Sequence, residues 1–98
     1  MTITKKLEGS KLELAIEGRL DTTTAPELEK EIAESAADIK DLTLDLKDLV
    51  YISSAGLRVL LSAQKRMNKQ GSMVIRNVSE AIMEIFDVTG FSDILTIQ

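Results

Sequence analysis

Two stretches of the chain alternate apolar and polar residues with the period of two that a half-buried strand requires. They are residues 12–17 and residues 42–46. Two shorter segments, residues 3–7 and 72–75, predict two further strands. Because Gly9-Ser10 is a turn, residues 3–7 and 12–17 should form a hairpin. Residues 94–97 fit either a last edge strand or an extended tail.

Three helical stretches separate these strands, each with apolar residues at helical spacing. The first begins at Thr24-Ala25-Pro26-Glu27, a pattern typical of a capping box in which Thr24 is the N-cap. The second opens at Ser53-Ser54 and ends at Gly71. The third runs from a Ser79 cap to Gly90.

The order of strands and helices predicts an α/β fold. Strands buried on both faces read as continuous apolar runs, whereas these alternate, so the helices should cover mainly one face of the sheet. Right-handed crossovers between strands imply parallel pairing in the middle, and the hairpin adds an antiparallel member. We therefore expect a mixed four- to five-stranded sheet in a single domain spanning residues 1–98.

The amino-acid composition narrows the range of possible functions. Twelve basic and 16 acidic residues give a net charge of −4, which argues against nucleic acid as a direct partner. The chain has no cysteine and no histidine, which removes the commonest metal ligands and the usual general base. Asp45 and Asp48 fit solvated charges better than metal ligands. Residues 1–6 lack an apolar signal core, and no run approaches membrane-spanning length. We expect a cytoplasmic protein without cofactor or metal.

The most informative chemistry lies at Ser53-Ser54-Ala55-Gly56. Two hydroxyls at a helix N-terminus lie beside backbone N–H groups that lack intrahelical partners, so a phosphate there meets a favourable field. Plainer interpretations exist for each residue. The serines can be N-caps alone, Gly56 can merely permit close packing, and Asp21 can be a turn residue before the first helix.

An enzymatic role for these serines lacks support. Nucleophilic catalysis requires a base within hydrogen-bonding reach, and the nearest lysines, Lys47 and Lys65, have no spacing that indicates pairing. Gly9-Ser10-Lys11 is no P-loop, because the first glycine and its spacer are missing. The pattern favours a serine that is a substrate over one that is a catalyst.

The segment from Asp45 to Leu57 resembles the signature of STAS domains of the anti-sigma factor antagonist type. That signature is an Asp-Leu strand end, an apolar loop, and then Asp-Ser-(Ser/Thr)-Gly-Leu at a helix start. Gly18-Arg19-Leu20-Asp21 is similar to the family's entry to its first helix, and Thr89-Gly90-Phe91-Ser92-Asp93 to its closing segment.

This resemblance implies a phosphorylation switch and a protein that is not an enzyme. Family members bind an anti-sigma factor that is a serine kinase of the GHKL ATPase type, and phosphorylation of the signature serine releases it. A metal-dependent serine phosphatase resets the switch. The phosphorylated serine aligns with Ser54, and the acidic residue near it aligns with Asp21. Ala55 and Gly56 complete the supporting set.

The chain departs from the family pattern at two positions. Ser53 replaces the usual aspartate and is a second candidate acceptor, whereas Ala55 replaces a hydroxyl residue. Two other functions stay open. One is a non-switching scaffold or ligand-sensing STAS module in a signalling assembly. The other is a nucleotide or small-molecule binder that uses the Ser54 helix start as a phosphate cradle.

Overall fold

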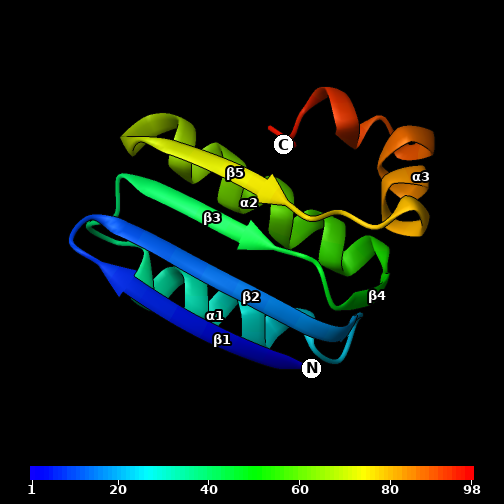
Figure 1. Ribbon diagram of the computed structural model, residues 1–98, viewed down its shortest axis with the longest axis horizontal. Helices are drawn as coiled ribbons and strands as arrows, with labels where there is room; N and C mark the ends of the chain where they lie inside the picture. Colours follow the sequence, from blue (N-terminus) through cyan, green and yellow to red (C-terminus); the bar gives the residue numbers. More distant parts are fainter.

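The computed structural model describes all 98 residues and contains five strands, three α-helices and one short 3-10 helix (Figure 1). The elements follow in the order β1 (Thr2–Glu8), β2 (Lys11–Leu20), α1 (Ala25–Ser35), β3 (Asp41–Asp45), β4 (Leu49–Ile52), α2 (Ser54–Gln70), β5 (Ser72–Arg76), α3 (Glu80–Thr89) and the 3-10 helix Phe91–Asp93.

The sheet has the strand order β1-β2-β3-β5, and β4 pairs with the far end of β2. The β1–β2 hairpin is antiparallel, and every other pair is parallel, which confirms the predicted mixed sheet. β2 is long enough to pair with two other strands along the same edge. Its first half pairs with β3 and its last residues pair with β4, with a change of register between Gly18 and Arg19. Gly18 has φ +98°, a backbone conformation that side chains with a Cβ rarely adopt.

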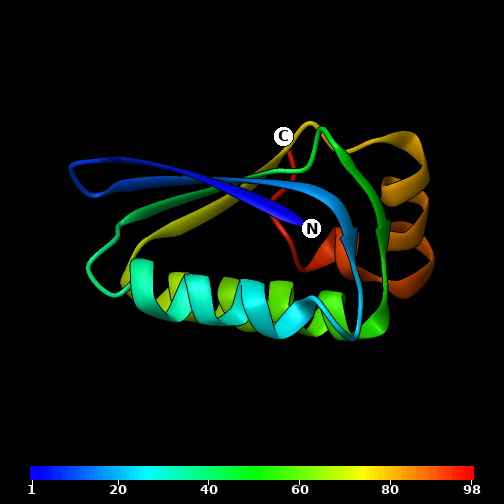
Figure 2. The same cartoon turned by 90° about the horizontal axis from the view of Figure 1, so that it is seen from below.

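The helices form a layer on one face of the sheet. Figure 2 shows α1 and α2 side by side below the strands, and α3 at the end of the sheet beyond β4. The opposite face carries side chains such as Glu13, Thr43 and Asp45 and has no helix against it. The prediction that helices cover mainly one face is therefore confirmed.

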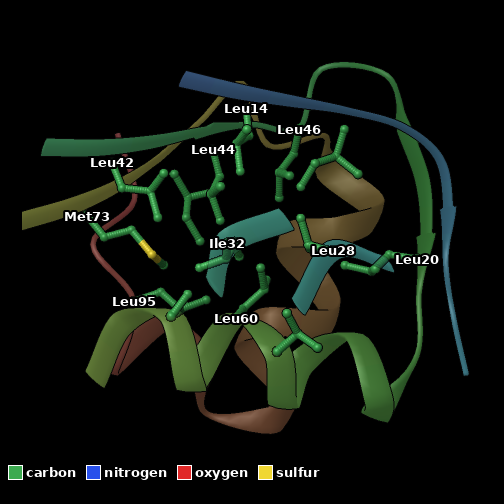
Figure 3. Packing of buried hydrophobic residues seen from close by; sticks show 14 of the residues in the cluster. Leu14, Leu20, Leu28, Ile32, Leu42, Leu44, Leu46, Leu60, Met73 and Leu95 are labelled. Carbon is green, nitrogen blue, oxygen red and sulfur yellow. The ribbon is translucent and has the colours of Figure 1, made fainter. Parts of the chain in front are cut away.

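One core of 24 buried hydrophobic residues lies between the sheet and the helices. The alternating strands supply Leu14 and Leu44, which are fully enclosed, and the helices supply Leu28 and Leu60 (Figure 3). These are the positions that the periods of two and 3.6 residues mark from the sequence. The core fixes the end of β2, the end of β4 and the start of α2 relative to one another.

The largest difference from the sequence prediction is β4. The family signature describes the corresponding stretch as an apolar loop, yet Leu49–Ile52 forms a strand in register with Gly18–Leu20. Likewise, β2 was expected to end before Gly18 and instead continues to Leu20. Both differences have the same cause, because the bulge at Gly18 turns β2 so that its last residues can pair with β4.

The C-terminus forms an extended tail instead of a full strand. Ile97 makes a single parallel bridge to Ile75 at the edge of β5. The buried side chain of Gln64 on α2 holds this tail, since its Oε1 accepts a hydrogen bond from Thr96 N at 3.4 Å. No helix in the structure combines the length and the apolar character needed to cross a membrane.

Candidate functional site

The site is built where β4 ends and α2 begins. Ser53 is the N-cap of α2, with extended backbone at φ −96° and ψ 176°. Its Oγ accepts a hydrogen bond from Gly56 N at 3.4 Å, and its backbone N–H donates to the Leu20 carbonyl at 2.9 Å. The expectation that one of the two serines caps the helix is confirmed, and the capping residue is Ser53.

Ser54 is the first residue of α2, and its side chain is exposed. Its hydroxyl makes no hydrogen bond within the chain, in contrast to that of Ser53. The backbone N–H groups of a helix's first turn have no intrahelical carbonyl to bond, and the helix dipole places partial positive charge there. The free hydroxyl of Ser54 therefore meets solvent at a position that favours an added negative group.

Gly56 is buried and lies directly against the end of β2. A Cβ at this position would lie 2.8 Å from Leu20 Cγ, 2.8 Å from Ile52 Cγ1 and 3.0 Å from the Leu20 carbonyl oxygen. Glycine is thus required by close packing, which is the plainer of the two interpretations that the sequence offered. The preceding residue, Ala55, is half-buried and packs against the core. Gly56 and Ala55 together allow the first turn of α2 to pack closely against the ends of β2 and β4.

Asp21 lies immediately after Leu20, so the strand end that binds Ser53 also carries this carboxylate. Asp21 Oδ1 accepts hydrogen bonds from Thr23 Oγ1 at 2.8 Å, Thr23 N at 3.0 Å and Thr24 N at 3.2 Å. The hydrogen bond from the Thr23 side chain, with those from the Thr24 and Thr23 backbone, lowers the pKa of Asp21 below its usual value. Asp21 therefore orders the turn before α1.

The predicted capping box at Thr24 is wrong. Thr24 is the N-cap residue by position, but its side chain makes no cap hydrogen bond and its backbone is helical. Its Oγ1 donates to the Arg19 carbonyl at 2.9 Å and accepts from Asp21 N at 2.8 Å. The hydroxyl is engaged by the preceding turn instead, because such short polar side chains readily bond neighbouring backbone groups in place of a helix start.

Sequence reasoning missed two residues at the site, Arg19 and Tyr51. They face each other in the β2–β4 register, and the Arg19 guanidinium lies 4.2 Å from the centroid of the Tyr51 ring. Arg19 Nε also lies 3.6 Å from Asp21 Oδ2. No local signal identifies this pair, because it exists only through the pairing of β4 with β2.

Exposed apolar side chains adjoin the site. Val50 is 69% exposed and Tyr51 is 38% exposed, both on β4 just before the two serines. On α3, which lies beside β4, Val88 is 79% exposed. Exposed apolar residues that gather near one site commonly mark a protein contact surface.

The charges of the helices are segregated. α2 carries Arg58, Lys65, Arg66 and Lys69 and no acidic residue, whereas α3 carries Glu80, Glu84 and Asp87 and no basic residue. Asp45, considered above as a solvated charge, accepts hydrogen bonds from Lys47 N at 2.9 Å and Asn77 Nδ2 at 3.1 Å. It orders the turn after β3.

Comparison with known proteins identifies the family to which the chain is similar. The STAS domain family model matches residues 2–98. The chain is 36% identical over 88 residues to the anti-sigma-B factor antagonist of Bacillus subtilis, a match that covers 89% of this chain and 81% of that protein.

Solved structures share the fold. An anti-sigma factor antagonist from Mycobacterium paratuberculosis superimposes with a TM-score of 0.88 at 23% identity, over 98% of this chain and 83% of that one. The Bacillus cell fate determinant SpoIIAA in its phosphorylated form gives a TM-score of 0.77 at 13% identity, over 99% and 91% of the two chains.

Proposed function

The chain belongs to the STAS domain family of anti-sigma factor antagonists, and from this premise we propose that it binds an anti-sigma factor and releases it when Ser54 is phosphorylated. Residues 1–98 act as one binding domain in the cytoplasm, without catalytic chemistry of their own. The observation that carries the proposal is the exposed Ser54 hydroxyl, which has no hydrogen-bond partner at the first position of α2.

The partner under this proposal is an anti-sigma factor that is itself a serine kinase of the GHKL type, with a metal-dependent serine phosphatase as the opposing enzyme. Two findings support a regulator of this class. The curated relative from Bacillus subtilis is an anti-sigma-B factor antagonist. A protein of the same fold, SpoIIAA, has been determined in a phosphorylated form.

Ser54 is a better acceptor than Ser53 for a geometric reason. Ser53 Oγ is engaged as the cap of α2, and its residue is half-buried against the end of β2. Modification of Ser53 would sacrifice the cap, which is worth about 1 kcal/mol of helix stability. Modification of Ser54 sacrifices no hydrogen bond.

Phosphate at Ser54 controls binding through charge. The group adds about −1.5 to −2 charge at pH 7, which the helix start tolerates because of its free N–H groups. The same charge lies next to the exposed apolar surface of Val50 and Tyr51, where a bound partner would have to desolvate it. A penalty of about 3–4 kcal/mol weakens binding by a few hundred-fold, which is sufficient for release.

The test is incubation with ATP and the cognate kinase, followed by phosphopeptide mass spectrometry. Ser54→Ala should abolish incorporation, whereas Ser53→Ala, a matched change at the neighbouring serine, should leave most of it. Phosphate found on Ser53 in the wild-type protein would refute the assignment to Ser54.

Two other results would indicate a function different from the one proposed. Partner binding without any incorporation would indicate a non-switching scaffold. Nucleotide binding in the absence of a kinase would indicate a phosphate cradle at the start of α2.

A further inference from the structure

Ser54 shares the outward face of α2 with a row of basic residues. Residues four apart on a helix lie one above the other, so Arg58 follows Ser54 after one turn. Lys65 and Lys69 continue the same face, and all four side chains are exposed. The groups that bury α2 against the sheet, such as Leu57 and Leu60, lie on the opposite side.

Arg58 has no partner within the chain. The two ion pairs of the structure are Lys5–Glu31 and Arg19–Asp21, and no hydrogen bond involves the Arg58 side chain. α2 itself has no acidic residue to pair with it. An exposed arginine on this face therefore retains all five of its N–H donors.

The other charged groups near the start of α2 are already engaged. Asp21 is bonded by Thr23 and Thr24, and Arg19 is held between Asp21 and the ring of Tyr51. On α1, which packs beside α2, Glu29 lines the groove between the two helices together with Arg66, not with Arg58. Arg58 is thus the free cation one turn from the Ser54 hydroxyl.

We infer that Arg58 is the intramolecular partner of the phosphate on Ser54. The inference rests on the proposed phosphorylation of Ser54 and deepens it. The guanidinium fork matches two phosphate oxygens, and such charge-assisted pairs are roughly twice as strong as neutral ones. The pair favours the phosphate dianion over the monoanion, since the dianion gains more from the cation. Arg58 is a positioning residue that fixes the modified side chain along the helix.

The pair has a second effect on the surface. The unmodified chain presents Arg58 as an exposed, unpaired positive charge one helical turn from Ser54. Once phosphate is bound, that charge is neutralised. Phosphorylation therefore adds negative charge and withdraws a positive one at the same place, so a single modification reverses the sign of the helix start.

The test uses the full chain with phosphoserine installed at position 54 during translation, so it does not depend on any kinase. The second pKa of the phosphate, ordinarily near 6, is followed by ³¹P NMR as pH is varied. Arg58→Gln should raise this pKa by about 0.3 to 0.6 pH unit. Arg58→Lys should restore most of the difference.

The control is Arg66→Gln, which removes the same charge from the same helix at a position about 18 Å from Ser54 along the helix axis, whereas Arg58 lies only about 6 Å from Ser54. It should shift the phosphate pKa much less than Arg58→Gln. In concentrated urea, where the helical spacing is lost, the wild-type and Arg58→Gln values should coincide.

An unchanged pKa in Arg58→Gln, or an equal shift in Arg66→Gln, would overturn the inference and reduce Arg58 to one charge in a general field. Neither result touches the proposed function. That proposal fails separately if the kinase leaves Ser54 unmodified or if the phosphate does not alter partner binding.

Discussion

Gly56 is the residue at which the fold leaves least space beside the candidate site. Its backbone lies so close to Leu20 and Ile52 that a single methyl group would meet both side chains and the Leu20 carbonyl. Glycine in a helix ordinarily costs about 1 kcal/mol relative to alanine. Its presence here shows that contact with the end of β2 outweighs helix propensity.

We therefore expect Gly56→Ala to lower the free energy of unfolding by about 1–2 kcal/mol, because the overpacking cost exceeds the gain in helix propensity. Urea denaturation monitored by circular dichroism measures the change. Ser62→Ala, an exposed substitution on the same helix, should stay within about 0.5 kcal/mol of wild type. A more stable Gly56→Ala protein would show that the end of β2 relaxes without cost.

Asp21 offers a second residue-scale prediction, in the pH dependence of stability. The hydrogen bonds from Thr23 and Thr24 lower its pKa in the folded state below the ordinary aspartate value of 3.8. The ionised carboxylate thus stabilises the fold above the unfolded pKa, and that contribution is lost as pH falls through the folded pKa.

Asp21→Ala should lower the melting temperature at pH 7, and the difference from wild type should shrink as pH falls below about 4. Thermal unfolding at several pH values follows the effect. Ser62→Ala, which removes no titratable group, serves as the control and should show the same small difference from wild type at every pH. A constant difference for Asp21→Ala at every pH would mean that the side chain acts by packing alone.

At the scale of secondary-structure elements, most of the fold is predictable because its signals are local. The alternating strands, the serine caps at Ser53 and Ser79, and the glycine stop at Gly90 depend on neighbours within a few residues. They appear in the structure as the sequence predicts. The sequence indicated that one of the two serines caps α2, but only the structure identifies that residue as Ser53 and leaves Ser54 with the free hydroxyl.

The parts that were missed depend on distant neighbours. In β4, Val50 and Tyr51 both point to solvent between buried Leu49 and Ile52, so the segment shows no period of two. Only the pairing with β2 makes it a strand. The stacking of Arg19 on Tyr51 needs the same pairing, and the failure of the Thr24 cap needs the competing turn at Asp21.

The N-terminus of α2 leads to a prediction about the thermal stability of the protein phosphorylated at Ser54. Phosphate at Ser54 should leave the thermal midpoint within about 5 °C of the unmodified value, because the helix start offers N–H donors and Ser54 gives up no hydrogen bond. Differential scanning calorimetry of the two forms measures this. Loss of a cooperative transition on phosphorylation would show that the modification melts the domain instead of changing its surface.

The whole molecule is built of two layers, with the candidate site at the end of the sheet where β2, β4 and α2 meet (Figures 1 and 2). The backbone of the site packs against the buried core, whereas the Ser54 side chain is exposed to solvent. Such an arrangement permits a surface change without a conformational change. Under the proposed function, we therefore expect control of association to rest on charge at the contact.

We expect Ser54→Asp to weaken binding to the kinase-type partner by at least about tenfold, and Ser54→Ala to retain it. Both variants keep a small side chain at the first position of α2, but only aspartate carries charge. Aspartate is also well tolerated at a helix start, so the fold should persist. Isothermal titration calorimetry compares the two, and equal affinities would remove charge as the cause of release.

The arrangement of β2 between partners from distant parts of the chain has a consequence for how the protein folds. Its parallel contacts with β3 and β4 join segments separated by α1, so each requires closure of a long loop before any contact forms. The β1–β2 hairpin alone pairs neighbours. Folding should therefore be slower than that of an all-helical chain of this length, with the hairpin forming early and the pairing of β4 with β2, which positions the start of α2, forming later.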